Sequence, residues 1–167
     1  MSVEEHRASS PERVACFVLT VSDSRTLETE TSGRAIAELL QESGHEVVAR
    51  DLVRDEPAEV ARIVRDHIDS GRVRVVITTG GTGITSRDST YEALTALFDK
   101  RLDGFGELFR MLSFQEIGAA AMLTRATAGV VNRCAVFLLP GSEHAVRLAM
   151  QRLIIPELGH VVRELSR

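Results

Sequence analysis

The chain has 167 residues, of which 44% are hydrophobic and 26% are charged, and its formal net charge at pH 7 is −4. A chain of this length and composition is typical of one globular domain with a single core. Because the charge is negative and aromatic residues make up only 4% of the chain, we expect neither nucleic acid nor an anionic membrane surface as a partner.

The first residues and the cysteines indicate a cytoplasmic domain. Residues 1–13 are polar and lack the apolar segment of a signal peptide, so we expect a mobile tail followed by a single domain at 14–167. No stretch of sequence is apolar over the length that a membrane span needs. Cys16 and Cys134 form no CxxC pair, which argues against a zinc knuckle or a redox motif, and two buried thiols fit a reducing cytosol.

The first half of the chain alternates apolar runs with helical patterns. The runs predict strands at residues 15–22, 45–53 and 73–79. Three strand–helix units in succession predict a parallel sheet with right-handed crossovers and helices on both faces. The carboxyl ends of such strands form the ligand crevice, and Asp23 and Asp55 each follow one of these strands. The alternative for each aspartate is an ordinary solvated turn.

A glycine-rich loop follows the third strand. Gly80, Gly81 and Gly83 let the backbone take positive φ and let a ligand approach the main chain, and a helical pattern begins near Tyr91. This order of strand, glycine loop and helix N-terminus predicts an anion site that suits a phosphate. Asp88 at the same mouth would repel a bare phosphate, but it can hold Mg²⁺ that bridges a polyphosphate.

Other interpretations of this loop are a plain turn or a better-known phosphate motif. In a plain turn, Asp88 or Ser89 caps the helix and Glu92 completes a capping box. The loop is not a Walker loop, because no lysine follows its glycines, and Ser86 stands where the dinucleotide fingerprint needs its third glycine. The five histidines show no metal-ligand spacing and are expected to be surface or turn residues.

The second half of the chain contains a similar loop. Runs at 126–131 and 135–139 predict a hairpin, and the second run leads through Gly141 and Ser142 into a helical pattern. These features predict a second anion site, and two such sites at one sheet edge suit a substrate with two phosphate-bearing halves. A short helix is expected at 107–111. Around it lie large apolar side chains that we expect to be divided between core and subunit contact: Phe98, Phe105, Phe109, Met111 and Phe114.

Four separated motifs resemble those of a known family. They are, in chain order, TTGGTG at 78–83, RDSTYEA at 87–93, GFGELFR at 104–110 and LPGS at 139–142. In this order they resemble the MoaB/MogA family of molybdenum cofactor biosynthesis, from about Ala15 to Leu165, and GFGELFRMLSFQEIG favours the MoaB branch. With the strand–helix order, this implies a three-layer α/β/α sandwich with a mostly parallel sheet and a small antiparallel hairpin.

The resemblance also implies an activity: adenylyl transfer from Mg-ATP to molybdopterin, which gives adenylylated molybdopterin and pyrophosphate. The implied cofactor is Mg²⁺, ATP is a substrate, and the implied assembly is a homotrimer or hexamer. Catalysis is assigned to Asp88 and Asp55, and Mg²⁺ binding to Asp88. The nucleotide phosphates are assigned to Gly80, Gly81, Thr82, Gly83 and Arg87. Molybdopterin is assigned to Asp23, Ser24, Gly104, Gly106, Gly141 and Ser142.

Two positions depart from the family pattern, and two other functions stay open. Glu30 stands where the family usually has the Asp of Asp-x-Ser-Gly, so the role of this acid is left open. Tyr91 stands where many MogA-type members have proline. The same site could belong to a non-catalytic molybdopterin- or nucleotide-binding protein. A trimeric scaffold is the other alternative, and the absence of a long linker or second domain weighs against it.

Overall fold

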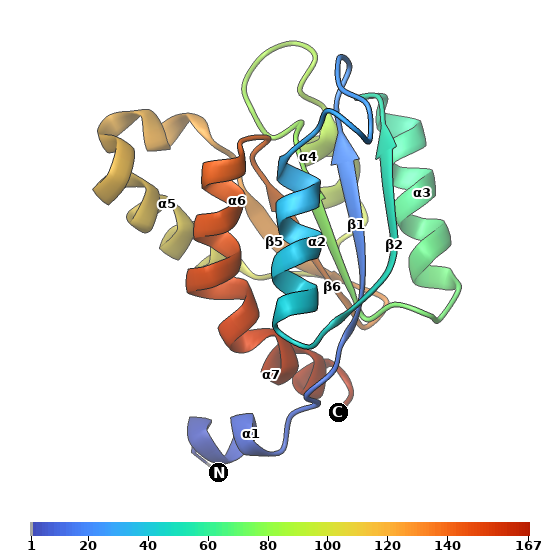
Figure 1. Ribbon diagram of the computed structural model, residues 1–167, viewed down its shortest axis with the longest axis vertical. Helices are drawn as coiled ribbons and strands as arrows, with labels where there is room; N and C mark the ends of the chain where they lie inside the picture. The colour runs from blue at the N-terminus through green and yellow to red at the C-terminus, as the bar shows by residue number, and fades with distance from the viewer. Residues whose placement is uncertain (1) are drawn as a thin grey trace.

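One mixed sheet of six strands organises residues 2–167, the part of the chain that the computed structural model describes (Figure 1). The strand order is β2-β1-β3-β6-β5-β4, in which the first four strands run parallel and the last two pairings are antiparallel. The strands are β1 (Ala15–Val21), β2 (Glu46–Val53), β3 (Val75–Thr79), β4 (Lys100–Arg101), β5 (Thr127–Val131) and β6 (Cys134–Leu139).

Helices connect these strands and cover the sheet. They are α1 (Val3–Ala8), α2 (Ser32–Glu42), α3 (Pro57–Asp69), α4 (Thr90–Thr95), α5 (Asp103–Ile117), the 3₁₀ turn η1 (Gly118–Leu123), α6 (Glu143–Ala149), the π turn η2 (Met150–Ile154) and α7 (Ile155–Leu165). Within residues 2–167, none of these helices combines the length and the apolar character that crossing a bilayer requires.

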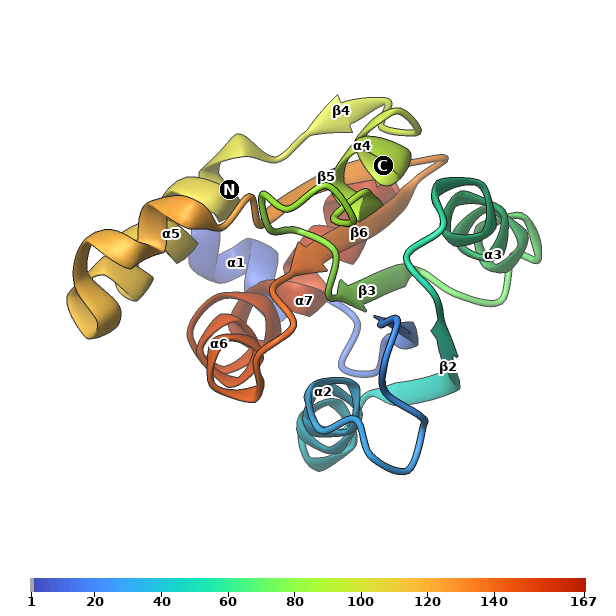
Figure 2. The ribbon, with the colours of Figure 1, turned by 90° about the horizontal axis from the view of Figure 1, so that it is seen from above.

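The helices form a layer on each face of the sheet. α2, α5, α6 and α7 contribute to one apolar cluster, and α3 and α4 contribute to the other (Figure 2). Along β3, Val75 and Ile77 belong to the first cluster while Val76 belongs to the second, so the strand is buried on both faces. These three layers and the β5–β6 hairpin confirm the predicted fold class.

Helix α5 differs most from its prediction. The expected helix at 107–111 is instead Asp103–Ile117, and Gly104 and Gly106 lie in its first turn. Glycine in a helix is unfavourable by about 0.5–1 kcal/mol relative to alanine. Because of these two glycines, the sequence pattern does not predict a helix start at Asp103. Packing overrides that preference, because Phe109 is only 1% exposed. By contrast, α4 is shorter than its pattern and ends at Thr95.

The N-terminal segment contains a helix that the polar composition does not predict. Ser2 and Glu5 form a capping box at the start of α1, and α1 lies against α7 (Figure 1). Arg7 forms an ion pair with Glu157, and Nδ1 of His6 is 3.1 Å from Oε1 of Glu164. The segment 2–13 is therefore not structureless, and its mobility stays a prediction. Residue 1 lies outside the described residues.

An apolar face of α5 and η1 is exposed. Figure 1 shows this segment projecting from the layered body of the molecule. Phe109 packs in the core, whereas Phe114 on the same helix is 62% exposed, so the expected subunit contact of this region stays a prediction. The other large exposed side chains of this face are Leu108, Met111, Ile117, Met122 and Leu123.

The two glycines of α5 give a matched test of this helix. A Cβ on Gly104 meets nothing within 4 Å, so Gly104→Ala should raise the free energy of unfolding by about 0.5–1 kcal/mol. A Cβ on Gly106 would overlap Nη2 of Arg110 and lie 2.9 Å from the carbonyl oxygen of Ala126. Gly106→Ala should therefore lower the free energy of unfolding by about 1–3 kcal/mol. Urea denaturation measures the free energy of unfolding of both variants. If the two substitutions changed it by the same amount and in the same direction, this placement of the helix would be contradicted.

Candidate functional site

A cavity opens where β1 and β3 end. In the strand order β2-β1-β3, the chain leaves β1 toward one side and reaches β3 on the other, so this is a topological switch point, where open α/β sheets bind ligands. Figure 2 views the molecule from this end. The cavity has a volume of about 210 Å³. It is lined mainly by polar residues: Thr20, Val21, Ser22, Ser24, Arg25, Glu30, Thr31, Ser32, Thr79 and Gly141.

Thr20, one of the residues that line this cavity, carries a buried hydroxyl, and its Oγ1 has no hydrogen-bond partner in residues 2–167. A Cβ on Gly33 would overlap this oxygen, so glycine is required where α2 passes the end of β1. Buried polar groups are usually paired. The hydroxyl oxygen of Thr20 is therefore an exception to this rule, enclosed between β1 and Gly33 of α2.

Glu30 holds the first turn of α2. Its side chain is 2% exposed, its Oε2 accepts a hydrogen bond of 2.7 Å from the Gly33 N–H, and its Oε1 forms an ion pair with Arg50 of β2. The first N–H groups of a helix have no acceptor within the helix, and Glu30 supplies an acceptor for one of them. Thr31 at the N-cap makes no such bond through its side chain. The acid that departs from the family pattern has a structural role here.

The glycine-rich loop passes very close to β1. Gly80 and Gly81 have φ angles of 97° and 73°, which L side chains rarely adopt. A Cβ on Gly80 would overlap the carbonyl oxygen of Val21, and one on Gly81 would overlap Oγ1 of Thr90. Gly141 of the second loop is also adjacent, since its Cβ would lie 3.5 Å from Cα of Gly80. The two predicted anion loops therefore lie side by side.

Asp88 closes the glycine-rich loop on itself. Its Oδ2 accepts hydrogen bonds from the N–H and the hydroxyl of Thr85, at 2.9 and 2.6 Å. A Cβ on Gly83 would lie 2.7 Å from the same oxygen, so only glycine leaves room for the carboxylate. Ser89 is the N-cap of α4, and neither it nor Asp88 caps that helix with its side chain. Both of these hydrogen bonds reach the same carboxylate oxygen, Oδ2.

Asp55 attaches the loop to β2. The residue is 6% exposed, and its carboxylate accepts a hydrogen bond of 2.7 Å from the Ser89 hydroxyl and one of 3.4 Å from the Thr90 hydroxyl. The Ser89 N–H lies 3.3 Å from both carboxylate oxygens. Asp55 thus supplies from another strand the anchoring at the start of α4 that the sequence suggested for Asp88 or Ser89.

Arg87 is paired with two acids at the rim. Its Nε and Nη2 donate to the two oxygens of Asp23, both at 3.0 Å, and Nη2 also donates to Glu56 at 3.0 Å. The hydrogen bond from Arg87, and after it the one from the Asp55 N–H, lower the pKa of Asp23. The same two acids raise the pKa of Arg87. The Arg87 side chain is nevertheless 57% exposed, so a phosphate at the rim could contact this guanidinium.

The sequence is similar to that of a known protein family over nearly its whole length. The family model described as "Probable molybdopterin binding domain" matches residues 17–160. Molybdenum cofactor biosynthesis protein B of Bacillus subtilis is 52% identical to this chain and that of Bacillus cereus 51%, each over 100% of this chain and 99% of the relative. The chain belongs to this molybdenum cofactor biosynthesis family.

Solved structures of the family have the same fold. A crystal structure of molybdenum cofactor biosynthesis protein B is 51% identical, with a TM-score of 0.91 over 95% of this chain and 99% of that chain. The tungsten cofactor synthesizing protein MoaB from Pyrococcus furiosus is 39% identical, with a TM-score of 0.85 over 95% of this chain and 100% of that chain. The predicted resemblance to the MoaB/MogA family is confirmed.

The structure brings some predicted site residues together and separates others. Asp23, Asp55 and Arg87 are linked by hydrogen bonds, and Ser24 and Gly141 both line the cavity of the switch point. Ser142 caps α6 by accepting a hydrogen bond of 3.1 Å from Ala145. Two predicted pterin residues lie in the first turn of α5, away from this cavity: Gly104, which lines an apolar cavity with residues of α7, and Gly106, which packs against Ala126.

Arg125 is a residue of the site that sequence reasoning missed. Its backbone N–H donates to the Thr82 carbonyl at 3.1 Å, its Nε to the Gly83 carbonyl at 3.0 Å and its Nη2 to the Asp88 carbonyl at 3.3 Å. The guanidinium also lies 4.7 Å from the centre of the Tyr91 ring. Arg125 comes just before β5, far along the chain from the loop, and no local pattern signals this contact. The cavity residues Thr20, Ser32 and Thr79 were missed for the same reason.

Replacing Glu30 tests whether it holds α2. Glu30→Ala leaves Arg50 without its carboxylate and the Gly33 N–H without its acceptor. We expect a loss of about 2–3 kcal/mol in the free energy of unfolding, less than for a fully buried pair because Arg50 is partly exposed. Glu30→Gln keeps an acceptor for Gly33 and should lose about half as much.

The matched control is Glu38→Ala on the exposed face of α2, which should change the same free energy by less than about 0.5 kcal/mol. Urea denaturation with circular dichroism measures all three variants. A Glu30→Ala protein as stable as the control would show that Glu30 does not hold the helix.

Proposed function

We propose that the chain transfers the adenylyl group of Mg-ATP to molybdopterin and releases pyrophosphate. The observation on which this proposal rests is the polar cavity at the switch point, which has Gly141 of the second loop in its lining and the glycine-rich loop packed against Gly141. The family of the chain and the names of its relatives support a role in molybdenum cofactor biosynthesis. The nucleotide and the reaction are those that the resemblance to the MoaB/MogA family implies, and the chemistry of the site suits them.

This reaction places modest demands on the protein. An oxygen of the terminal phosphate of molybdopterin forms a bond to the α-phosphorus of ATP, and the bond from that phosphorus to the bridging oxygen breaks, so pyrophosphate leaves with the electron pair. The attacking phosphate is already ionised at neutral pH, so no strong general base is needed. The protein has to align two anions and stabilise their charge.

The loops at this sheet edge suit that task. Gly80, Gly81 and Gly83 leave no side chains between the backbone and a ligand, and we assign the nucleotide phosphates to this loop with Thr82. We assign the molybdopterin phosphate to the adjacent loop at Gly141 and Ser142, at the start of α6. Arg87 lies at the rim, where a polyphosphate could draw it away from Asp23 and Glu56.

The donor groups of the loop also fit Mg²⁺. This ion prefers oxygen ligands and is usually held by one or two carboxylates together with phosphate oxygens and water. Within residues 2–167 the carboxylate of Asp88 accepts hydrogen bonds from neutral groups of Thr85, and both reach Oδ2, so we assign the metal to this carboxylate. Bound there, Mg²⁺ would neutralise charge on the phosphate oxygens. Asp55 keeps the loop in position.

A binding protein without catalytic activity is the second candidate. It is favoured by the pairing of the acids, since Asp55 and Asp23 already accept hydrogen bonds from Ser89 and Arg87. The decisive experiment is pyrophosphate release by the purified chain with molybdopterin and Mg-ATP. Bound molybdopterin without any adenylylated product would assign the chain to the binding function.

Asp88→Asn tests the catalytic role of the carboxylate. The amide oxygen of Asn keeps an acceptor for Thr85, so the free energy of unfolding should fall by only about 1 kcal/mol. The charge is lost, so turnover should fall by a factor on the order of 100 or more, as when one preorganised electrostatic group is removed. Binding of molybdopterin, which we assign to the other loop, should persist.

The matched control is Asp66→Asn on the exposed face of α3, where the only partner shown is Arg62. Its turnover should equal that of the unaltered chain. Unchanged turnover in Asp88→Asn, with or without a loss of stability, would limit Asp88 to shaping the loop.

We further propose that the exposed face of α5 and η1 joins copies of the chain into a trimer, which could stack into a hexamer. Exposed apolar side chains that gather on one element mark an interface, and Phe114 is 62% exposed within this face. Light scattering on a sizing column should give three or six chains at micromolar concentration.

Phe114→Glu should dissociate this assembly, because it puts a charge into the contact. Val3→Glu is the control, since Val3 is 57% exposed on α1, away from α5. An unaltered chain that elutes as a monomer would refute the proposed contact. So would a Phe114→Glu protein that keeps the same assembly.

A further inference from the structure

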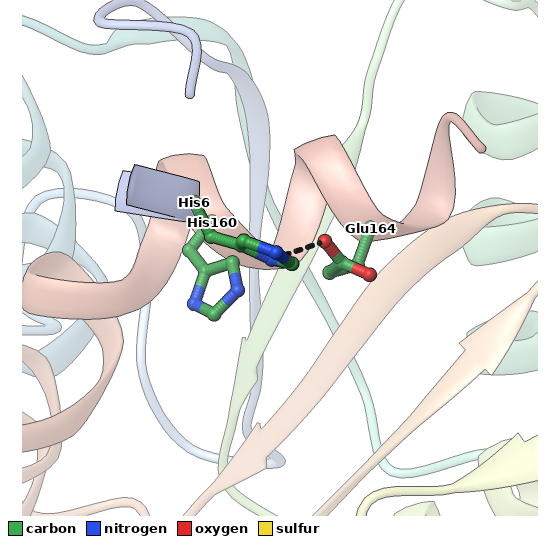
Figure 3. A group of neighbouring side chains, drawn as sticks. All are labelled: His6, His160 and Glu164. Atoms are coloured by element: carbon green, nitrogen blue, oxygen red, sulfur yellow. Dashed lines mark hydrogen bonds and ion pairs between the residues drawn. The ribbon is translucent and has the colours of Figure 1, made fainter. Parts of the chain in front are cut away.

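Two histidines and a glutamate meet at the end of the molecule opposite the glycine loops. His6 comes from α1, and His160 and Glu164 come from α7. Figure 1 shows both chain termini at this end, and Figure 3 shows the three side chains together where α1 lies across α7. The sequence suggested no metal spacing for any histidine, because His6 and His160 stand near opposite ends of the chain.

The three side chains are spaced as metal ligands. His160 and Glu164 are four residues apart, so they share one face of α7. One ligand atom from each of the three residues lies within 4.8 Å of the other two. Nδ1 of His6 is 3.1 Å from Oε1 of Glu164. Two ligands of a tetrahedral zinc ion, each about 2.0–2.1 Å from the metal, lie roughly 3.4 Å apart, so small side-chain movements would be enough.

A fourth residue orients one of the imidazoles. Glu157 is one turn away on α7, and its Oε2 is 2.9 Å from Nδ1 of His160. A carboxylate partner requires the proton to be on Nδ1, which leaves Nε2 with a free electron pair. Glu157 is itself paired with Arg7 of α1. A carboxylate that holds the second nitrogen of a ligating histidine is the usual outer partner in zinc sites.

The carboxylate ligand is ionised. Burial alone would raise the pKa of Glu164, but Arg167, His6 and Arg163 outweigh it and lower this pKa. Nη1 of Arg163 lies 2.9 Å from Oε1 of Glu164, and Nη1 of Arg167 lies 3.3 Å from Oε2. A metal ion would compete with these guanidinium groups for one oxygen and would replace the proton between His6 and Glu164.

We propose that His6, His160 and Glu164 bind one divalent transition-metal ion of the zinc class, with water as the remaining ligand, and that this ion fastens α1 to α7. Two imidazole nitrogens and one carboxylate suit Zn²⁺ or Co²⁺, whereas Mg²⁺ prefers oxygen ligands alone. The site is therefore independent of the Mg²⁺ proposed at Asp88, and it needs neither nucleotide nor molybdopterin.

The test is metal titration of the chelator-treated chain in the presence of excess Mg²⁺. One equivalent of Co²⁺ should bind per chain and give the intense visible absorption of tetrahedral cobalt, and one equivalent of Zn²⁺ should abolish that absorption. Hydrogen exchange should slow at the amides of α1 when Zn²⁺ is added, since the metal ties α1 to the body. Absence of the cobalt absorption, or unchanged exchange in α1, would overturn the proposal.

Four variants separate this site from adventitious binding. His6→Asn and His160→Gln should each weaken Zn²⁺ binding by a factor on the order of 100 or more, and Glu157→Gln by about 10–100-fold, as for an outer partner of a ligand. His144→Gln is the matched control, because His144 pairs with one glutamate, Glu116, on the other helices. It should leave affinity and absorption unchanged.

Circular dichroism confirms that each variant is folded. Equal Zn²⁺ affinity in His6→Asn and the unaltered chain would refute the site. So would loss of binding in the His144→Gln control.

Discussion

At the end of β3 the chain has to turn within contact distance of the last carbonyl of β1. Gly80 makes this turn with a φ of 97°, and any Cβ there would overlap the carbonyl oxygen of Val21. Gly81 continues the turn and leaves room for Thr90 and for Asp55. Because the loop starts so close to β1, Asp55 of the neighbouring strand end can reach Ser89 and hold the start of α4. The position of the whole site follows from this one close approach.

The charges at this sheet edge differ in how they are compensated. Asp23 is paired with a guanidinium, whereas within residues 2–167 the hydrogen bonds to the carboxylates of Asp55 and Asp88 come from neutral hydroxyl and amide groups. Asp55 is buried and surrounded by donors, so it has little capacity for a further ligand. Asp88 is less buried and has its hydrogen bonds on one oxygen. Asp88 is therefore the acid whose negative charge a bound cation would most readily neutralise.

The sequence predicted those parts of the fold that depend on local pattern. The strands and the glycine loop follow from apolar runs and from glycines that need positive φ, and the structure confirms them within one or two residues at each strand end. Tertiary contacts decide the rest. The length of α5 depends on the packing of Phe109, and the anchoring by Asp55 and Arg125 joins segments far apart in the chain. No pattern within a single segment contains that information.

One helical rod connects the two ends of the molecule. α6 begins at the Ser142 cap in the second glycine loop, continues through the π turn at Met150–Ile154 and leads into α7, which contains His160 and Glu164 (Figure 1). A proline in a helix removes a backbone donor and crowds the preceding turn, and the π turn just before Pro156 accommodates it. The rod therefore continues to Leu165. Its two ends differ in chemistry: the N-terminal end presents backbone donors and the Ser142 hydroxyl, which suit an anion, whereas the C-terminal end presents His160 and Glu164, which are of the residue types that bind transition metals.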